Sequence, residues 1–186
     1  MLSSNRAMKK YITLLSACLL WTTLPAHAAF DAFLKIEGVP GEATATGHKD
    51  EIDIESFSMG VARTVVTGGG GTQTGRPQFT DISFSHQLDK ASPLLMLRCA
   101  QGTVIPTAVL TCRTVGAASS LVFYKITLTD VIVTSVSVGG ASGGDRPTET
   151  FSLNYARIEW EYIPQLPTGG SGTPVRASWN IPANTP

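Results

Sequence analysis

Apolar and polar residues alternate along most of the chain beyond its N-terminal segment, and the alternation is longest from Leu121 to Val138. A period of two places apolar side chains on one face of a β-strand and polar side chains on the other. The pattern therefore predicts a long antiparallel strand with one solvated face. Its buried face is expected to carry Val122, Tyr124, Ile126, Leu128, Ile132, Val136 and Val138.

Shorter segments with the same period predict further strands, separated by glycine-rich turns. Phe30 to Ile36 is the first of them, and Gln78 to Leu88 is a later one. The segment from Val104 to Val115 is apolar at both parities. It is therefore expected to be a strand that is buried on both faces or contacts another chain.

Two predicted strands change phase midway. The apolar positions shift at Glu55–Ser56 in the first and at Tyr155–Ala156 in the second. One face stays buried across such a shift only if the strand holds an extra residue, so we predict a β-bulge at both places. Bulges bend and coil a sheet, which favours a closed barrel over a flat sandwich.

One segment has the pattern of a helix. Ser92 to Gln101 has a proline in its first turn and is followed by Gly102. Proline is favoured at the start of a helix and glycine just past its end. The fold is therefore predicted to be mainly β, a bulged antiparallel domain with one short α-helix.

Two segments lie outside this regular pattern. A long glycine-rich loop is expected over Ala62 to Pro77, and loops of that length in compact domains are functional or disordered. The C-terminal segment 166–186 is rich in Pro and Gly, but Val175 to Ile181 within it carries Trp179. Because an indole is costly to leave in solvent, we expect this segment to dock on the domain.

The first 28 residues have the pattern of a secretory signal peptide. Two lysines precede an uncharged apolar stretch, and small residues stand where signal peptidase requires them for cleavage between Ala28 and Ala29. A membrane anchor is the alternative, but the stretch is shorter than the roughly 20 residues that a spanning helix needs. We expect a signal peptide over 1–28, a β-domain over 29–165 and the docking segment over 166–186, in a product secreted to the periplasm or beyond.

Composition and charge exclude several classes of protein. The chain has 186 residues, enough for one sizeable core, with 14 basic and 14 acidic side chains. The signal segment contains three basic and no acidic side chains, so the mature chain is net acidic. This argues against nucleic-acid binding, which depends on neutralising phosphates. No other apolar run is long enough to cross a bilayer, so no membrane contact is expected of the mature form.

The histidines and the glycine-rich segment predict no metal, cofactor or phosphate site. His48 and His86 lack further ligands at a metal-binding spacing. We interpret His48 as a solvated turn residue and His86 as a hydrogen-bonded core residue. Gly70 to Gly75 resembles half of a phosphate-binding loop, but Arg76-Pro77 stands where Lys-Ser/Thr is required.

The carboxylates likewise predict no catalytic pair. Glu51, Asp53 and Glu55 could serve as paired carboxylates in acid–base chemistry. However, they alternate with isoleucines, so we interpret them as the solvated face of a strand. No catalytic residue is therefore predicted, and the chain is expected not to be an enzyme.

Cys99 and Cys112 are the two cysteines of the mature chain. They lack the Cys-x-x-Cys spacing that lowers a thiol pKa, which argues against a redox pair. An even pair of cysteines in an oxidising compartment predicts one structural disulfide instead. Closing that loop would stabilise the fold by roughly 3 kcal/mol in the chain-entropy model.

Six segments, taken in order, resemble the haemolysin-coregulated proteins (Hcp), the tube subunits of bacterial type VI secretion. The segments are 33–42, 48–58, 88–94, 124–136, 147–160 and 178–181. Together they extend over essentially all of the mature chain, and their order makes a chance match improbable.

The resemblance implies a small antiparallel β-barrel with one helix on its flank, in hexameric rings that stack into a hollow tube. It implies a non-enzymatic structural subunit without cofactors, whose partners are copies of itself and type VI spike, sheath or effector cargo. In the family, the long loop after the second strand reaches toward the neighbouring ring. The candidate stacking residues are therefore Val65, Val66, Thr67, Gly68, Gly69, Gly70, Gly71, Thr72 and Gln73.

The signal peptide is a departure from the family, whose tube subunits leave through a cytoplasmic machine without one. Either the signal is not used and the chain assembles in the cytoplasm, or the fold acts outside the inner membrane, where Cys99 and Cys112 would be oxidised. The alternatives are a secreted Hcp-like effector, a binding or adhesive β module, and an extracellular filament subunit independent of the type VI machine. A hydrolase is the least supported, because the sequence offers no nucleophile–base constellation.

Overall fold

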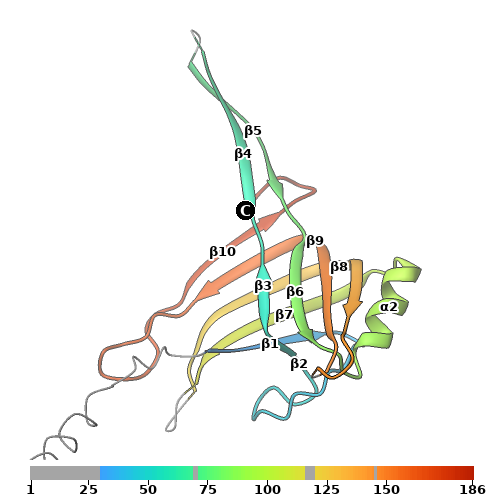
Figure 1. Ribbon diagram of the computed structural model, residues 1–186. Helices are drawn as coiled ribbons and strands as arrows, with labels where there is room; N and C mark the ends of the chain where they lie inside the picture. The colour runs from blue at the N-terminus through green and yellow to red at the C-terminus, as the bar shows by residue number, and fades with distance from the viewer. Residues whose placement is uncertain (1–29, 69–70, 116–119, 145) are drawn as a thin grey trace, which may run out of the picture.

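The structure is a computed structural model that describes residues 30–68, 71–115, 120–144 and 146–186 (Figure 1). The predicted signal peptide and its cleavage site, Ala28 and Ala29, lie outside these residues, as do Gly69 and Gly70. The elements are β1 (Phe30–Ile36), β2 (Ile52–Ile54), β3 (Ser56–Ser58), β4 (Val61–Gly68), β5 (Gly71–Phe79), β6 (Ile82–Gln87), α2 (Ser92–Gln101), β7 (Ile105–Thr114), β8 (Val122–Gly139), β9 (Thr148–Tyr162) and β10 (Val175–Asn180).

The main sheet is antiparallel and curls into a nearly closed barrel (Figure 1). Its strand order is β2-β1-β7-β8-β9-β6-β3, with β10 paired to β9. The two ends of this order, β2 and β3, are joined in the chain by the single residue Glu55. Because consecutive strands occupy opposite ends of the order, the sheet has to close on itself. The predicted antiparallel barrel with one helix is confirmed.

The phase change at Glu55–Ser56 is real, but the β-bulge predicted to cause it is wrong. β2 pairs with β1 and β3 pairs with β6, so the chain leaves one edge of the sheet and joins the other at Glu55. The Glu55 backbone N–H donates to the carbonyl of Ser85 (2.9 Å) and fixes the crossing. A change of partner strand, rather than an inserted residue, moves the buried positions from one parity to the other.

The second phase change is shared by two strands. On β9 the buried positions pass from Tyr155 to Ile158, as the sequence predicted. The β-bulge predicted at Tyr155–Ala156 is wrong, however, because the strands stay in register on both sides of Ala156. The residue opposite Ala156 is Asp130 of β8, whose φ is 52°. Asp130 is in the left-handed region, which turns the side chains that follow it on β8 to the other face. The buried positions therefore change parity at the same level on β8 and on β9.

The predicted buried face of β8 is therefore correct only in part. Ile126 and Leu128 are buried as expected, but beyond Asp130 the buried residues are Val131 and Val133, not Ile132. A register shift between Val133 and Ser135 returns the alternation to its earlier parity. Beyond this shift Val136 packs against the core, while Val138 is 41% exposed.

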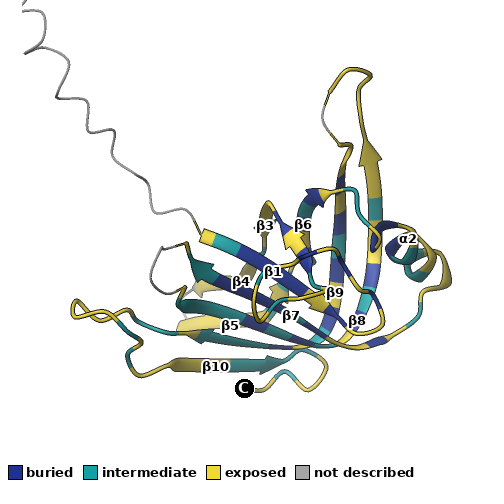
Figure 2. Cartoon of the chain, turned by 90° about the horizontal axis from the view of Figure 1, so that it is seen from below, coloured by how far each residue is buried: buried dark blue, intermediate teal, exposed yellow. Residues whose placement is uncertain are grey.

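The core fills the inside of the barrel, and Figure 2 shows the buried residues along its strands. α2 packs against β8 and contributes Leu95 to this core. The Gly102 N–H donates to the carbonyls of Arg98 and Cys99 and ends the helix with a φ of 61°, so the predicted helix is confirmed. The largest fully buried apolar side chains are Phe84, Phe151, Leu34, Ile52, Ile82, Leu95, Ile126, Leu128, Leu153 and Ile158.

The predicted long loop over Ala62 to Pro77 is instead a β-hairpin. β4 and β5 form a separate two-stranded sheet that projects from the barrel (Figure 1). Gln78 and Phe79, which were predicted to start the next strand, belong to β5, and β6 begins at Ile82. The threonines and valines on both sides of the glycines favour strand geometry, which the glycine content concealed.

Two strands behave as the sequence expects. β7 lies between β1 and β8, and its buried residues occupy both parities, with Leu110, Thr111 and Cys112 consecutive. The C-terminal segment docks as β10, which pairs along β9, and Trp179 packs against the core.

Candidate functional site

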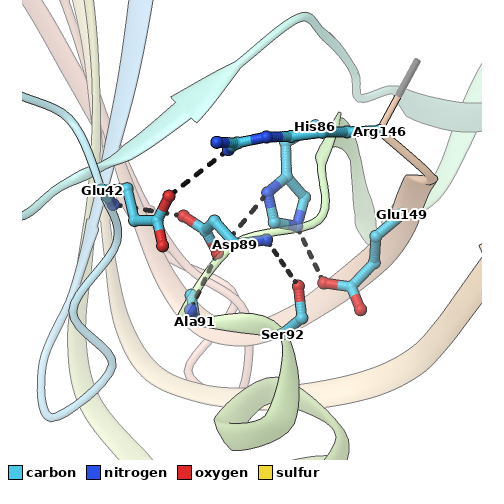
Figure 3. Close-up of polar contacts among 7 residues, drawn as sticks. All are labelled: Glu42, His86, Asp89, Ala91, Ser92, Arg146 and Glu149. Atoms are coloured by element: carbon cyan, nitrogen blue, oxygen red, sulfur yellow. Dashed lines mark hydrogen bonds and ion pairs between the residues drawn. The ribbon is translucent and has the colours of Figure 1, made fainter.

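A polar cluster surrounds the start of α2 at one end of the barrel (Figure 3). At its centre, His86 of β6 and Glu149 of β9 are both fully buried, and His86 Nε2 lies 2.8 Å from Glu149 Oε1. The ring also meets Phe151 edge-on. The structure thus confirms His86 as a hydrogen-bonded core residue. Its partner is 63 positions away in the chain, so sequence spacing gave no sign of it.

Asp89 connects this cluster to the surrounding loops. Its Oδ1 accepts a hydrogen bond from the backbone N–H of Ala91 (2.8 Å), and its Oδ2 accepts one from the backbone N–H of Glu42 (3.2 Å). The Arg146 guanidinium donates to Glu42 Oε2 (3.4 Å). The Asp89 carboxylate therefore joins the segment after β1 to the beginning of α2.

An acidic cavity of about 290 Å³ opens beside this cluster. It is lined by Glu42, Asp53, Glu55, Gln87, Asp89 and Arg146, that is, by four carboxylates and one guanidinium. Burial, followed by repulsion from Asp31 and Asp89, raises the pKa of Asp53. Negative charge is thus concentrated here beyond what the single arginine balances.

Substitution of Asp53 by asparagine is expected to change how stability depends on pH. An aspartate with a raised pKa in the folded state binds its proton more tightly there, so its charge lowers stability as pH rises through that pKa. Asp53→Asn should therefore be more stable than the unchanged chain at neutral pH and lose this advantage in acid. Thermal unfolding at neutral and at acidic pH measures the effect. The control is Glu37→Gln, which alters an exposed carboxylate. Equal changes in melting temperature for the two variants would contradict the prediction.

The carboxylates that the sequence analysis assigned to a solvated face have distinct environments. Asp53 and Glu55 line the cavity, whereas Glu51 is half-buried and its Oε2 lies 2.8 Å from His48 Nδ1. The prediction that His48 is simply solvated is wrong: its ring stacks on Phe33 at 4.4 Å, with Arg113 over the same Phe33 ring at 4.7 Å. The turn folds back over β1, which a local sequence pattern does not reveal.

The predicted disulfide is not formed in the structure. Cys99 on α2 is a half-buried free thiol, and Cys112 on β7 is a buried one. Cys112 faces the barrel core, and burial raises its thiol pKa to about 11. Cys99 packs against the same core from a helix that lies on β8 rather than on β7. Proximity in sequence therefore does not bring the two thiols together.

The candidate stacking residues lie on the projecting hairpin. Val65 and Val66 are 57% and 62% exposed, and Thr67, Thr72 and Gln73 are exposed beside them. Val66 pairs with Gln73 and Thr67 with Thr72 across the hairpin. The arrangement presents apolar and hydroxyl groups to solvent on a ribbon with free edges.

Residues 30–68, 71–115, 120–144 and 146–186 contain no group of three or more His, Cys, Asp or Glu side chains placed to hold a metal ion. The same part of the chain has no helix long and apolar enough to span a bilayer.

A nearly closed antiparallel barrel with a flanking helix and a projecting hairpin defines the class of small β-barrel proteins with an exposed extension. The family model described as "Type VI secretion system effector, Hcp" matches residues 33–162. The chain therefore belongs to the Hcp family of type VI secretion, as its sequence motifs indicated. Hcp proteins are structural tube and effector-carrier components of this system; they are secreted and form oligomers.

Individual relatives agree with this assignment. Protein hcp1 of Pseudomonas aeruginosa is 40% identical over 158 residues, which are 84% of this chain and 98% of that protein. A solved type six secretion system protein has a TM-score of 0.80 and 32% identity, and the match covers 84% of this chain and 99% of that one. Hcp1 from Salmonella typhimurium has a TM-score of 0.70 and 34% identity, with 84% and 98% covered.

Proposed function

We propose that this chain is a non-enzymatic structural subunit that assembles into hexameric rings, and that the rings stack into a tube through the β4–β5 hairpin. Copies of the chain are its main partners, and spike, sheath and effector cargo are its further partners. The observation that carries the proposal is the hairpin itself, in a chain of the Hcp family. It projects from the barrel (Figure 1), and its valines are exposed to solvent.

Physical chemistry supports an intermolecular role for this hairpin. An isolated two-stranded ribbon is marginally stable in water, and its free edges and exposed apolar residues favour association. Val61, Val65 and Val66 are each more than half exposed. Contact with a second molecule would bury these side chains and pair the edges. A projecting element that docks elsewhere on an identical copy makes a heterologous contact, which repeats along an axis.

Introducing charge on the hairpin should separate ring formation from stacking. We expect the double variant Val65→Asp, Val66→Asp to form single rings but no stacks, because two carboxylates would have to be desolvated at the contact. Light scattering and electron microscopy measure both states. The matched control is Val175→Asp on β10, a valine that is 64% exposed and should leave stacking unchanged. A chain that stays monomeric at every concentration would refute the proposed function, and stacks of the double variant would refute the role of the hairpin.

A further inference from the structure

The hairpin carries positive charge only. Between Val61 and Thr80 the charged residues are Arg63 and Arg76, with no Asp or Glu. Both arginines are exposed, and neither forms an ion pair with the residues that the structure describes. Arg63 pairs with Pro77, the neighbour of Arg76, so the two arginines lie at the same level of the ribbon, one on each of its faces. The base of the hairpin therefore presents two cations that lack a counter-charge.

The acidic cavity lies at the other end of the barrel. Figure 1 shows β2 and the end of β6 at the bottom of the barrel and the hairpin at the top, with β3 and β4 following one another between them. Arg63 is eight positions after Glu55 of the cavity, which is at most about 26 Å at the usual rise per residue of an extended chain. The elements that carry the cavity and the hairpin lie at opposite ends of the barrel, and the opposite charges of the two features remain available to other molecules.

A buried group behind the cavity also lacks a partner. His86 Nδ1 has no hydrogen-bond partner and points toward Asp89, whose Oδ1 is 4.0 Å away (Figure 3). Asp89 belongs to the cavity wall. Of the charges in that wall, only Arg146 is positive, and it is bound to Glu42. With four carboxylates and one guanidinium, the wall carries excess negative charge, which favours a cationic occupant.

The position of the arginines suits a contact between stacked copies. Arg63 is the third residue of β4, so it stands about 7 Å above the base of the hairpin. If the acidic end of a second copy rests on this base, the arginine side chains reach its cavity. The outer part of the hairpin, with Val65 and Val66, then lies along the wall of that copy, which buries the exposed valines.

We propose that Arg63 and Arg76 of one copy bind the acidic cavity formed by Glu42, Asp53, Glu55 and Asp89 at the opposite end of the next copy. This inference rests on the proposed stacking and names the surface that receives the hairpin. The contact is heterologous, so it gives the stack a direction and leaves one cationic and one anionic end. Because the charges are near the surface, stacking should weaken as the salt concentration rises.

Reciprocal charge reversal tests the contact. The variant Arg63→Glu, Arg76→Glu carries an acidic hairpin and an acidic cavity, and the variant Asp53→Lys, Glu55→Lys carries a basic hairpin and a basic cavity. Each alone should need at least about tenfold more protein to stack, because like charges face one another. When rings of the two variants are formed separately and then mixed in equal amounts, they should stack at the concentration of the unchanged chain, since alternating rings join opposite charges at every contact.

Controls make the result specific. The variant Lys35→Glu, Arg157→Glu changes the net charge as the hairpin variant does, at exposed positions outside both features, and should stack normally. Normal stacking by either reversed variant, or loss without recovery in the mixture, would overturn the proposed contact, while rings and stacks of the unchanged chain would still uphold the proposed function. A monomeric unchanged chain would overturn both.

Discussion

Replacing Glu149 by alanine is expected to lower the free energy of unfolding by roughly 3–5 kcal/mol, because removal of one partner from a buried pair leaves the other uncompensated. Glu149 and His86 are both 0% exposed and are joined at 2.8 Å. The variant leaves the His86 Nε2 without its partner in a place that water does not reach. Denaturant unfolding at one fixed protein concentration measures the loss.

Two comparisons identify the pair as the cause. Thr150→Ala alters the next residue of β9, which is exposed, and should change stability by less than about 1 kcal/mol. Replacing both members, as in His86→Leu, Glu149→Leu, should cost less than Glu149→Ala alone, because no polar group is then left buried without a partner. An unfolding free energy of Glu149→Ala equal to that of the unchanged chain would show that the pair contributes nothing.

Replacing Phe84 by alanine is expected to cost a similar 3–5 kcal/mol, for a different reason. Phe84 is 2% exposed, lies opposite Phe57 and Phe151 in the sheet, and stacks on the Phe151 ring at 5.2 Å. Its truncation removes apolar contact on both sides and leaves a cavity that the strands of a closing barrel cannot collapse to fill. The same unfolding measurement reports the loss.

The control for this variant is Phe30→Ala. Phe30 is 52% exposed at the start of β1 and meets Phe123 edge-on, so its loss should cost no more than about 1 kcal/mol. Phe84→Leu keeps most of the buried volume, so its loss of unfolding free energy should lie between those of Phe84→Ala and Phe30→Ala. If Phe84→Ala and Phe30→Ala unfold at the same denaturant concentration, the packing of Phe84 is not what holds the barrel closed.

The acidic cavity shows why the candidate site was only partly predictable. Asp53 and Glu55 were recognised as polar positions on a strand, but Glu42, Asp89 and Arg146 come from turns before and after other elements. Sequence distance gives no measure of their separation in space, so neither the cavity nor the pairing of His86 with Glu149 could be read in advance. The hairpin was found as an unusual segment, although its strand structure was missed.

The order of apolar and polar residues by itself determined most strands of the barrel, the helix that ends at Gly102 and, through six ordered motifs, the Hcp family. These features depend on side chains near in sequence, whose period fixes which face is buried. Only the tertiary structure decided how Glu55 closes the barrel, where Asp130 lies on β8, and that Cys99 and Cys112 are free thiols. Each of these depends on which distant strand lies alongside, because pairing and burial are set by the closed sheet as a whole and not by any local run of residues.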